Sequence, residues 1–391
     1  MDFSTPGERT RDIRKRRGMG QEDLARLSGV SVATIRNMEQ GTGTRPRVQT
    51  LLKLASALRV DTTILMHPGQ PEAPDPAPVD PWDDVRAALY EELPGGGEPA
   101  TEEGILAALA GCIPDIGANR YSRVRVVLPG LIRDARSLGR EGRAAQATVY
   151  DTAAWLLTQT RQFSDAEAAV RLALDAAPDH QHAASPAATW AWCLLRQGRL
   201  AEAAALAERW ADDLEPARVS RATPGQLAGW GKLLLYVNNA AVRDNRSGAA
   251  EDALSLAGMA AERIGREVRM GASTTRTFGP GTVLMIRGEN EVLTGNPQRV
   301  LDIAERVPWD GLLYRGSASK RRHRLDVASA HVMLRRRDEA IGVLSELRDQ
   351  APEWLAQQRT ARDVMESLLG QWKRTIPAQV RELADAVQLP L

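Results

Sequence analysis

Apolar residues recur at helical spacing through most of this 391-residue chain. From about Ile105 onward they return every three or four positions, and short polar breaks separate the stretches. We find no convincing alternation of apolar and polar positions, the mark of a half-buried strand. A smaller N-terminal set at helical spacing would pack around one core: Ile13, Leu24, Val30, Ile35, Met38, Leu51, Leu54 and Leu58. The pattern therefore predicts an all-α protein.

A proline-rich stretch divides the chain into two unequal parts. Residues 67–84 contain six prolines and no apolar periodicity, so they form neither a helix interior nor a central strand. Because proline stiffens an extended chain, we interpret them as a semi-rigid linker. A second break at 93–103 isolates a short helix over about 85–92. We therefore predict an N-terminal domain over 1–66, this linker, and a helical region over 85–391.

Five breaks in the C-terminal region share one form, in which a turn precedes a small residue that opens an amphipathic helix. They are the segments RQFSDA, GRLAEA, GAAEDA, GNPQRV and RRRDEA. Their closing residues lie 37, 50, 47 and 40 positions apart and are Ala166, Ala203, Ala253, Val300 and Ala340. This recurrence predicts a solenoid of stacked helix pairs with insertions.

One of these units resembles a full tetratricopeptide repeat. In residues 187–216, Ala203 and Ala207 stand where the two helices of such a repeat touch, and Pro216 ends the second helix. Residues 165–178 and 338–352 end on the same helix-stopping proline. Asp244 departs from the family, because an aromatic residue is usual at its position. The resemblance therefore supports the superhelix more strongly than the register of each repeat.

The N-terminal region carries the signals of two short helices joined by a tight turn. A basic helix over 8–17 precedes a helix over 21–27 that has two acidic residues in its first turn. Gly29 supplies the turn, and Ser31 is a good N-cap for a helix over 32–40. In this context, residues 7–66 resemble the phage repressor and Cro family of helix-turn-helix DNA-binding domains, also called the xenobiotic-response-element family.

This resemblance implies that the helix over 32–40 enters the major groove of duplex DNA, where base pairs are distinguishable. The candidate DNA-binding residues are Gln21, Ser31, Val32, Ala33, Thr34, Arg36, Asn37, Arg45 and Arg47. Within this set, Gln21 matches a phosphate-binding residue, although it is also a simple helix-start residue, and the two last arginines match contacts to the DNA backbone or minor groove. Arg14 and Glu39 match a buried structural ion pair.

Tetratricopeptide-like helix pairs leave a concave groove that binds peptides or partner segments in that family. The groove-facing positions of the family fall here on Asp151, Trp155, Trp192, Arg196, Asn238, Asn245, Glu289 and Arg322. The amide of Asn238 lies on an apolar helix and must find a partner, which is either a peptide backbone or a neighbouring turn or water. The basic run 319–325 would attract an acidic partner or form a solvated helix face.

Charge is distributed unevenly. The whole chain has a net charge of +1, whereas residues 1–66 hold twelve Lys or Arg against seven Asp or Glu. This concentration fits a polyanionic partner such as DNA. Cys112 and Cys193 are too few for a disulfide framework, the N-terminus is charged, and no long apolar window occurs. We therefore expect a cytoplasmic protein that does not enter a membrane.

The sequence gives little support for catalytic chemistry. None of the five histidines lies in a HExxH-type arrangement, although His180 and His182 in one segment are a weak metal signal. Phosphate-binding glycine loops and nucleophile elbows are also missing. We expect no enzyme, no cofactor and no metal site.

Together these features predict a sequence-specific transcriptional regulator of double-stranded DNA. A homodimer is expected, because two recognition helices about 34 Å apart read successive major-groove faces. A small molecule, peptide or protein bound to the solenoid would modulate its activity. The alternative is a repeat scaffold or inhibitor that captures a protein partner, with the helix-turn-helix serving localisation.

Overall fold

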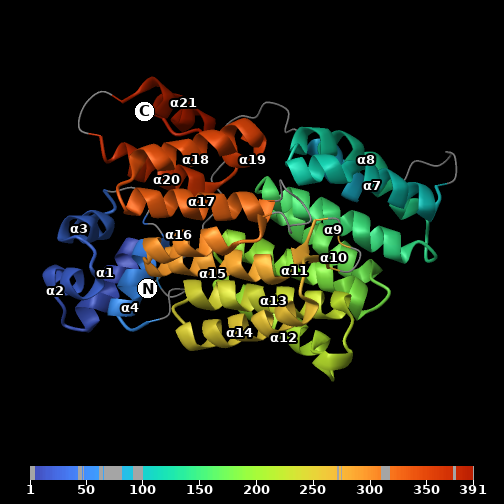
Figure 1. The fold of residues 1–391 in the computed structure, drawn as a ribbon, viewed down its shortest axis with the longest axis horizontal. Helices are drawn as coiled ribbons and strands as arrows, with labels where there is room; N and C mark the ends of the chain where they lie inside the picture. Colours follow the sequence, from blue (N-terminus) through green and yellow to red (C-terminus); the bar gives the residue numbers. More distant parts are fainter. Residues whose placement is uncertain are drawn as a thin grey trace.

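The chain is folded almost entirely into helices, as the apolar spacing predicts (Figure 1). The computed structural model describes residues 5–42, 46, 48–60, 65, 82–90, 100–270, 273, 275–309, 318–372 and 376–390. Most of the predicted linker, residues 67–81, lies outside these ranges. No helix within the described ranges combines the length and the apolar character needed to cross a bilayer.

Four N-terminal helices form a small bundle at one side of the molecule, blue in Figure 1. They are α1 (Pro6–Arg16), α2 (Gln21–Ser28), α3 (Val32–Gln40) and α4 (Val48–Ala57). The predicted core residues gather into one cluster, with Ile13 partly buried and the other seven buried. Gly7 allows α1 to lie directly on α3, because a Cβ there would be 1.9 Å from the carbonyl oxygen of Met38.

Five helix pairs form the body of the C-terminal region. They are α9 (Arg143–Gln159) with α10 (Phe163–Ala176), α11 (His180–Gln197) with α12 (Leu200–Leu214), α13 (Pro224–Arg243) with α14 (Ser247–Ile264), α15 (Pro280–Thr294) with α16 (Pro297–Arg306), and α17 (Ala318–Met333) with α18 (Arg337–Gln350). The two helices of each pair contact each other, and the first helices of successive pairs also contact one another. This is the stacking of a helix-pair solenoid.

Each turn inside a pair contains one residue with a left-handed backbone, at φ between 59° and 84°: Arg161, Gly198, Asn245, Gly295 and Arg335. The fifth residue after each is small and buried: Ala166, Ala203, Ala250, Val300 and Ala340. The sequence-based register is therefore wrong by three positions in the third pair, where it selected Ala253. The cause is Asn245, which takes the left-handed position that the pattern assigned to a glycine turn at Gly248.

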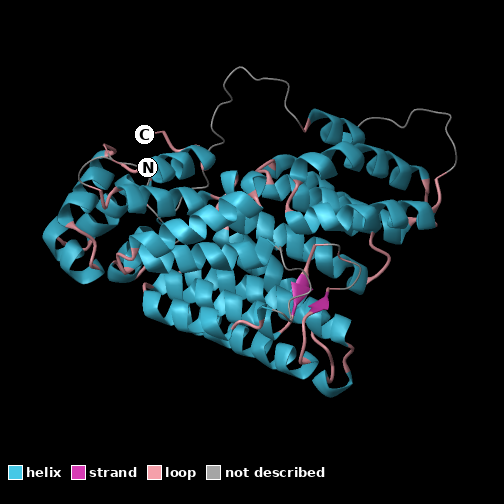
Figure 2. Ribbon diagram, turned by 45° about the horizontal axis from the view of Figure 1, so that its top comes forward, coloured by secondary structure: helices cyan, strands magenta, loops and turns pink. Residues whose placement is uncertain are grey.

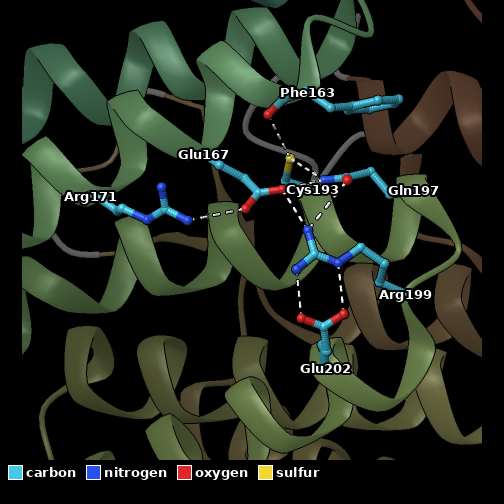
Figure 3. A network of polar contacts seen from close by, with 7 residues as sticks. All are labelled: Phe163, Glu167, Arg171, Cys193, Gln197, Arg199 and Glu202. Atoms are coloured by element: carbon cyan, nitrogen blue, oxygen red, sulfur yellow. Dashed lines mark hydrogen bonds and ion pairs between the residues drawn. The ribbon is translucent and has the colours of Figure 1, made fainter. Parts of the chain in front are cut away.

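Polar contacts fasten neighbouring pairs to each other near the second turn (Figure 3). Glu167 of α10 accepts hydrogen bonds from Gln197 at 2.8 Å and from Arg199 at 2.7 Å, and Arg199 also donates to Glu202 at 2.8 Å. Cys193 lies beside this network, and burial raises the pKa of its thiol to about 11. The thiol is therefore protonated at neutral pH and serves as part of the packing.

Further helices flank the five pairs and join the two ends of the solenoid. They are α6 (Asp83–Tyr90), α7 (Glu102–Ala118) and α8 (Tyr121–Ser137) before the pairs, and α19 (Pro352–Ala356), α20 (Arg359–Leu369) and α21 (Ala378–Ala386) after them. The backbone N–H and the hydroxyl of Ser122 on α8 donate to Glu353 on α19 at 2.8 and 2.7 Å. Arg321 on α17 donates to the carbonyl of Gly117 on α7 at 3.2 Å. The superhelix is thus closed on itself, which the sequence did not predict.

A small antiparallel hairpin interrupts the helices (magenta in Figure 2). Its strands are β1 (Val268–Arg269) and β2 (Thr277–Phe278), and a short 3-10 helix η1 (Val219–Arg221) lies earlier in the chain. Phe278 packs on Gly231 of α13, where a Cβ would lie 2.2 Å from the ring. The sequence analysis expected no strands, because two residues per strand are too few to show alternation. The hairpin carries Arg276 into the interior, where it is 4% exposed.

Candidate functional site

The second and third helices have the geometry of a helix-turn-helix. Gly29 ends α2 in a left-handed conformation, at φ 68°, and the Ser31 hydroxyl caps α3 by accepting from the N–H of Thr34 at 3.1 Å. Glycine removes the steric penalty of that conformation, and the cap satisfies one free N–H of the helix start. The turn is therefore encoded by two local signals that the sequence analysis identified.

The outward face of α3 is open to solvent at the positions predicted to read DNA. Ser31, Ala33, Thr34, Arg36 and Asn37 are exposed even with the C-terminal helices in place, and Val32 is half-buried. Inward positions of the same helix are buried: Ile35, Met38 and Glu39. Arg36 forms neither a hydrogen bond nor an ion pair with any residue that the structure describes. This guanidinium is consequently available to a base or a phosphate.

A buried ion pair fixes α3 against α1. Arg14 donates from Nε and Nη2 to the two carboxylate oxygens of Glu39, at 2.7 and 2.8 Å, and both residues are less than 10% exposed. Burial favours a raised pKa for Glu39, but hydrogen bonds from Arg14 and Gln21 outweigh it and the pKa is lowered. The predicted structural pair is confirmed.

Of the three residues predicted to contact the DNA backbone or minor groove, the structure describes only Gln21. The Gln21 amide donates to Glu39 Oε2 at 2.8 Å, so in this structure its side chain orients the buried carboxylate. Its role towards phosphate stays a prediction. Arg45 and Arg47 lie outside the described residues, and so does most of their loop.

A second candidate site lies inside the closed solenoid. It is a cavity of about 310 Å³ lined by the first helices of all five pairs, by residues 275–277 at the start of β2 and by residues 358–360 at the start of α20. This volume is at the lower end of the range for small-molecule sites. The predicted concave surface therefore exists, and closure of the ring narrows it to a cavity that is partly open to solvent.

Five of the eight predicted groove residues line this cavity: Trp155, Trp192, Arg196, Glu289 and Arg322. The other three do not. Asp151 is buried behind it and accepts hydrogen bonds from Ser185 and Thr189. Asn245 is exposed in the turn between α13 and α14, where its left-handed backbone has the structural role.

Asn238 is also satisfied within the protein and does not line the cavity. Its amide donates to the carbonyl of Ala250 at 2.9 Å, and its oxygen accepts from Asn290 at 3.2 Å. The neighbouring-turn interpretation fits this residue, which is fully buried. The adjacent Asn239 lines the cavity instead.

Sequence reasoning missed several polar residues of the cavity. Lys232, Tyr236 and Arg243 come from α13, and Arg276 comes from the segment next to β2. Arg243 is ion-paired with Glu289. The lysine had a sequence signal, a lone cation in the apolar stretch 227–237, whereas Arg276 depends on a hairpin that no local pattern indicates.

His323 and Asp326 on α17 complete the lining on one side. Burial and the nearby Arg324 lower the pKa of His323 to about 4, so its imidazole is neutral at pH 7. Burial and the neighbouring Glu289 raise the pKa of Asp326 well above its usual range. Among the described residues, no group of three or more His, Cys, Asp or Glu side chains is arranged to hold a metal ion.

Comparison with known proteins identifies one part of the chain. No curated protein and no solved structure matches it. Residues 11–65, which contain the second and third helices and the turn between them, match the family model described as Helix-turn-helix.

Proposed function

We propose that this protein is a sequence-specific transcriptional regulator that binds duplex DNA through α3. The supporting observation is the open face of α3 within a segment that matches a helix-turn-helix family. Exposed Thr34, Arg36 and Asn37 offer hydroxyl, guanidinium and amide groups, the side-chain types that pair with base edges. A homodimer in the cytoplasm is the form proposed, so that two copies of α3 read two half-sites. The proposal includes no enzymatic activity.

We further propose that occupancy of the cavity modulates DNA binding. Helix α15 supports this idea, because it lines the cavity with Met285 and Glu289 and also contacts α4 of the N-terminal bundle. Leu52 on α4 is 8% exposed although it is not part of the N-terminal core, which fits a face covered by α15. A shift of one rigid helix would therefore reach both sites.

Selection of genomic fragments by the full-length protein tests DNA recognition. We expect one sequence motif to be enriched at physiological salt and affinity to fall as salt is raised. Enrichment no better than that of random duplex would refute the proposal. Light scattering of the protein with a selected fragment should show two chains per duplex.

Substitution on α3 tests the assigned reading face. Asn37→Ala should change base preference at one position of the motif, by about 1–3 kcal/mol. Arg140→Gln, in an exposed turn of the C-terminal region, is the control and should leave the motif unchanged. If Asn37→Ala weakened every sequence equally, α3 would not be reading bases at this residue.

A further inference from the structure

Positive charge strongly exceeds negative charge in the lining of the cavity. Among the described lining residues, the cations are Arg161, Arg196, Lys232, Arg243, Arg276, Arg322 and Arg359. The acidic lining residues are only Glu289 and Asp326. Most of these groups are partly or fully removed from water, where an uncompensated charge is costly. The cavity thus concentrates positive charge that an anionic partner would neutralise.

The acidic residues of the cavity lining and the two described carboxylates behind it neutralise only part of this excess. Glu289 is engaged by Arg243, and the raised pKa of Asp326 makes it a poor counterion. Two further carboxylates lie behind the lining. Asp151 stands 3.8 Å from Arg276 but accepts from two hydroxyls, and Glu267 accepts from the N–H and the hydroxyl of Thr282 at 2.8 Å each. Even with these included, cations remain in the majority.

Three cations lack a carboxylate within ion-pair distance among the described residues. Lys232 is 7% exposed, and its ammonium group lies over the Tyr236 ring, 5.8 Å from the ring centroid. Arg196 donates only to neutral oxygens, those of Gln358 at 3.3 Å and of the Gln357 backbone at 3.4 Å. Arg322 has no hydrogen bond or ion pair within the described ranges, although its charge helps to lower the pKa of Glu289.

These cations also lie within electrostatic range of one another. Burial, together with Arg322 and Arg161, lowers the pKa of Arg196 to about 9. Burial also lowers the pKa of Lys232, with Arg276 and Arg322 adding to the effect. Helices α11, α13 and α17 and the segment next to β2 therefore present like charges to the same cavity. An anion placed there would relieve both the desolvation and the mutual repulsion.

The remaining lining supplies flat and apolar surface. Trp155 and Trp192 come from α9 and α11, and Met285 and Ile286 come from α15. The Arg196 guanidinium lies over the Trp192 ring at 5.6 Å, so a charged group and an aromatic face are adjacent. A ligand matched to this surface carries an apolar or aromatic body beside its negative charge.

We propose that the cavity binds a small organic dianion with an aromatic or apolar body, either a phosphate monoester or a dicarboxylate, as the effector of the regulator. This inference rests on the function proposed above for the cavity. Two negative charges match the cations from separate helices, and a volume of about 310 Å³ suits a small molecule.

Calorimetric titration of the full-length protein tests the ligand class with defined probes. Phenyl phosphate and phthalate represent the two dianion types, inorganic phosphate lacks the ring, and benzamide is the neutral control. We expect one dianion to bind at least tenfold more tightly than benzamide and than inorganic phosphate. The dianion that binds more tightly shows whether the effector is a phosphate monoester or a dicarboxylate. Equal or tighter binding of benzamide would overturn the proposal.

Charge-removing variants test the site. Lys232→Met with Arg322→Gln should weaken binding of the preferred dianion at least tenfold. Arg140→Gln with Arg209→Gln removes the same charge from exposed positions and should change binding less than twofold. Equal losses from both pairs would show binding to net charge alone and would overturn the assignment.

A stability measurement separates a ligand-binding lysine from a structural one. Because Lys232 is buried with no carboxylate of the described residues within ion-pair distance, Lys232→Met should raise the midpoint of thermal unfolding in buffer free of polyvalent anions. A lowered midpoint would contradict the proposal. Failure of all dianions to bind, with sequence-specific DNA binding intact, would overturn this inference alone.

Discussion

Breaking the ion pair between Arg14 and Glu39 should unfold the DNA-binding helices while the C-terminal helices stay folded. In Arg14→Met, Glu39 keeps its buried position but loses both hydrogen bonds from the guanidinium. Leaving one partner of a buried pair uncompensated costs about 3–5 kcal/mol. A domain of 66 residues has about 3–10 kcal/mol of stability in total. The loss is therefore comparable with the whole stability of the bundle.

Hydrogen exchange of the full-length protein measures this loss region by region. Protection of α1 and α3 should fall by about 100-fold or more, because each 1.4 kcal/mol corresponds to a factor of ten. Arg16→Met is the matched control on α1, since Arg16 pairs with Asp12 at the surface and should cost at most about 1 kcal/mol. Arg14→Met with Glu39→Leu should recover much of the lost protection, because no unpaired charge remains.

The same variant should also reverse the direction in which the Glu39 contribution to stability changes with pH. In the native protein the pKa of Glu39 lies below 4.5, so its contribution to stability is present above pH 4.5 and is lost as pH falls through the lowered pKa. In Arg14→Met, burial is no longer opposed by the guanidinium and the pKa should rise above 4.5. Protonation would then favour the folded state as pH falls. A loss below about 1 kcal/mol, or an unchanged slope, would refute the reasoning.

Three further predictions follow from the C-terminal region. Gly198→Ala should lower the free energy of unfolding by about 1–2 kcal/mol in urea titrations, because φ is 79° at this position. Gly248→Ala, in the first turn of α14, is the control and should be neutral or stabilising. Equal effects of the two substitutions would contradict the turn assignment. Gly231→Ala should lower the free energy of unfolding by about 1–3 kcal/mol, because the added Cβ forces Phe278 away. Gly225→Ala, on the same helix, has no neighbour within 4 Å and is the control. Equal stabilities of the two variants would argue against this contact. His323→Leu should reduce the loss of stability on acidification. The pKa of His323 is about 4 in the folded protein and 6.5 in the unfolded chain, so this residue removes about 2 kcal/mol of stability as pH falls from above 6.5 to 5. If the thermal midpoints of the variant fell with pH as steeply as those of the native protein, the buried neutral imidazole would be refuted.

Local signals predicted the N-terminal bundle well, because its boundaries depend on residues close in sequence. Gly29 and Ser31 define the turn within three positions, and the apolar spacing selects the core. The same local logic located four of the five turns in the C-terminal pairs. It failed at the third, because Gly248 has the composition of a turn residue although it lies in α14, and the left-handed residue is Asn245, three positions earlier.

The cavity was only partly predictable, because its shape depends on contacts between distant residues. Repeat positions on the first helices pointed to Trp155, Trp192 and Arg322, which do line it. Closure depends on contacts such as that of Ser122 with Glu353, 231 positions apart, which no periodicity encodes. The same holds for Arg276, which reaches the interior on a hairpin of two-residue strands.

Closure of the superhelix changes how this chain must fold and unfold. In an open array each unit is held by its neighbours, so end units fray first and unfolding spreads gradually. Here α7 and α8, near the start of the region, contact α17 and α19, near its end, so fraying at either end also breaks contacts at the other. We expect the C-terminal region to melt as one cooperative unit and to fold slowly, because its sealing contacts join distant parts of the sequence. During synthesis, the contact of Ser122 on α8 with Glu353 can form only after α19 has left the ribosome.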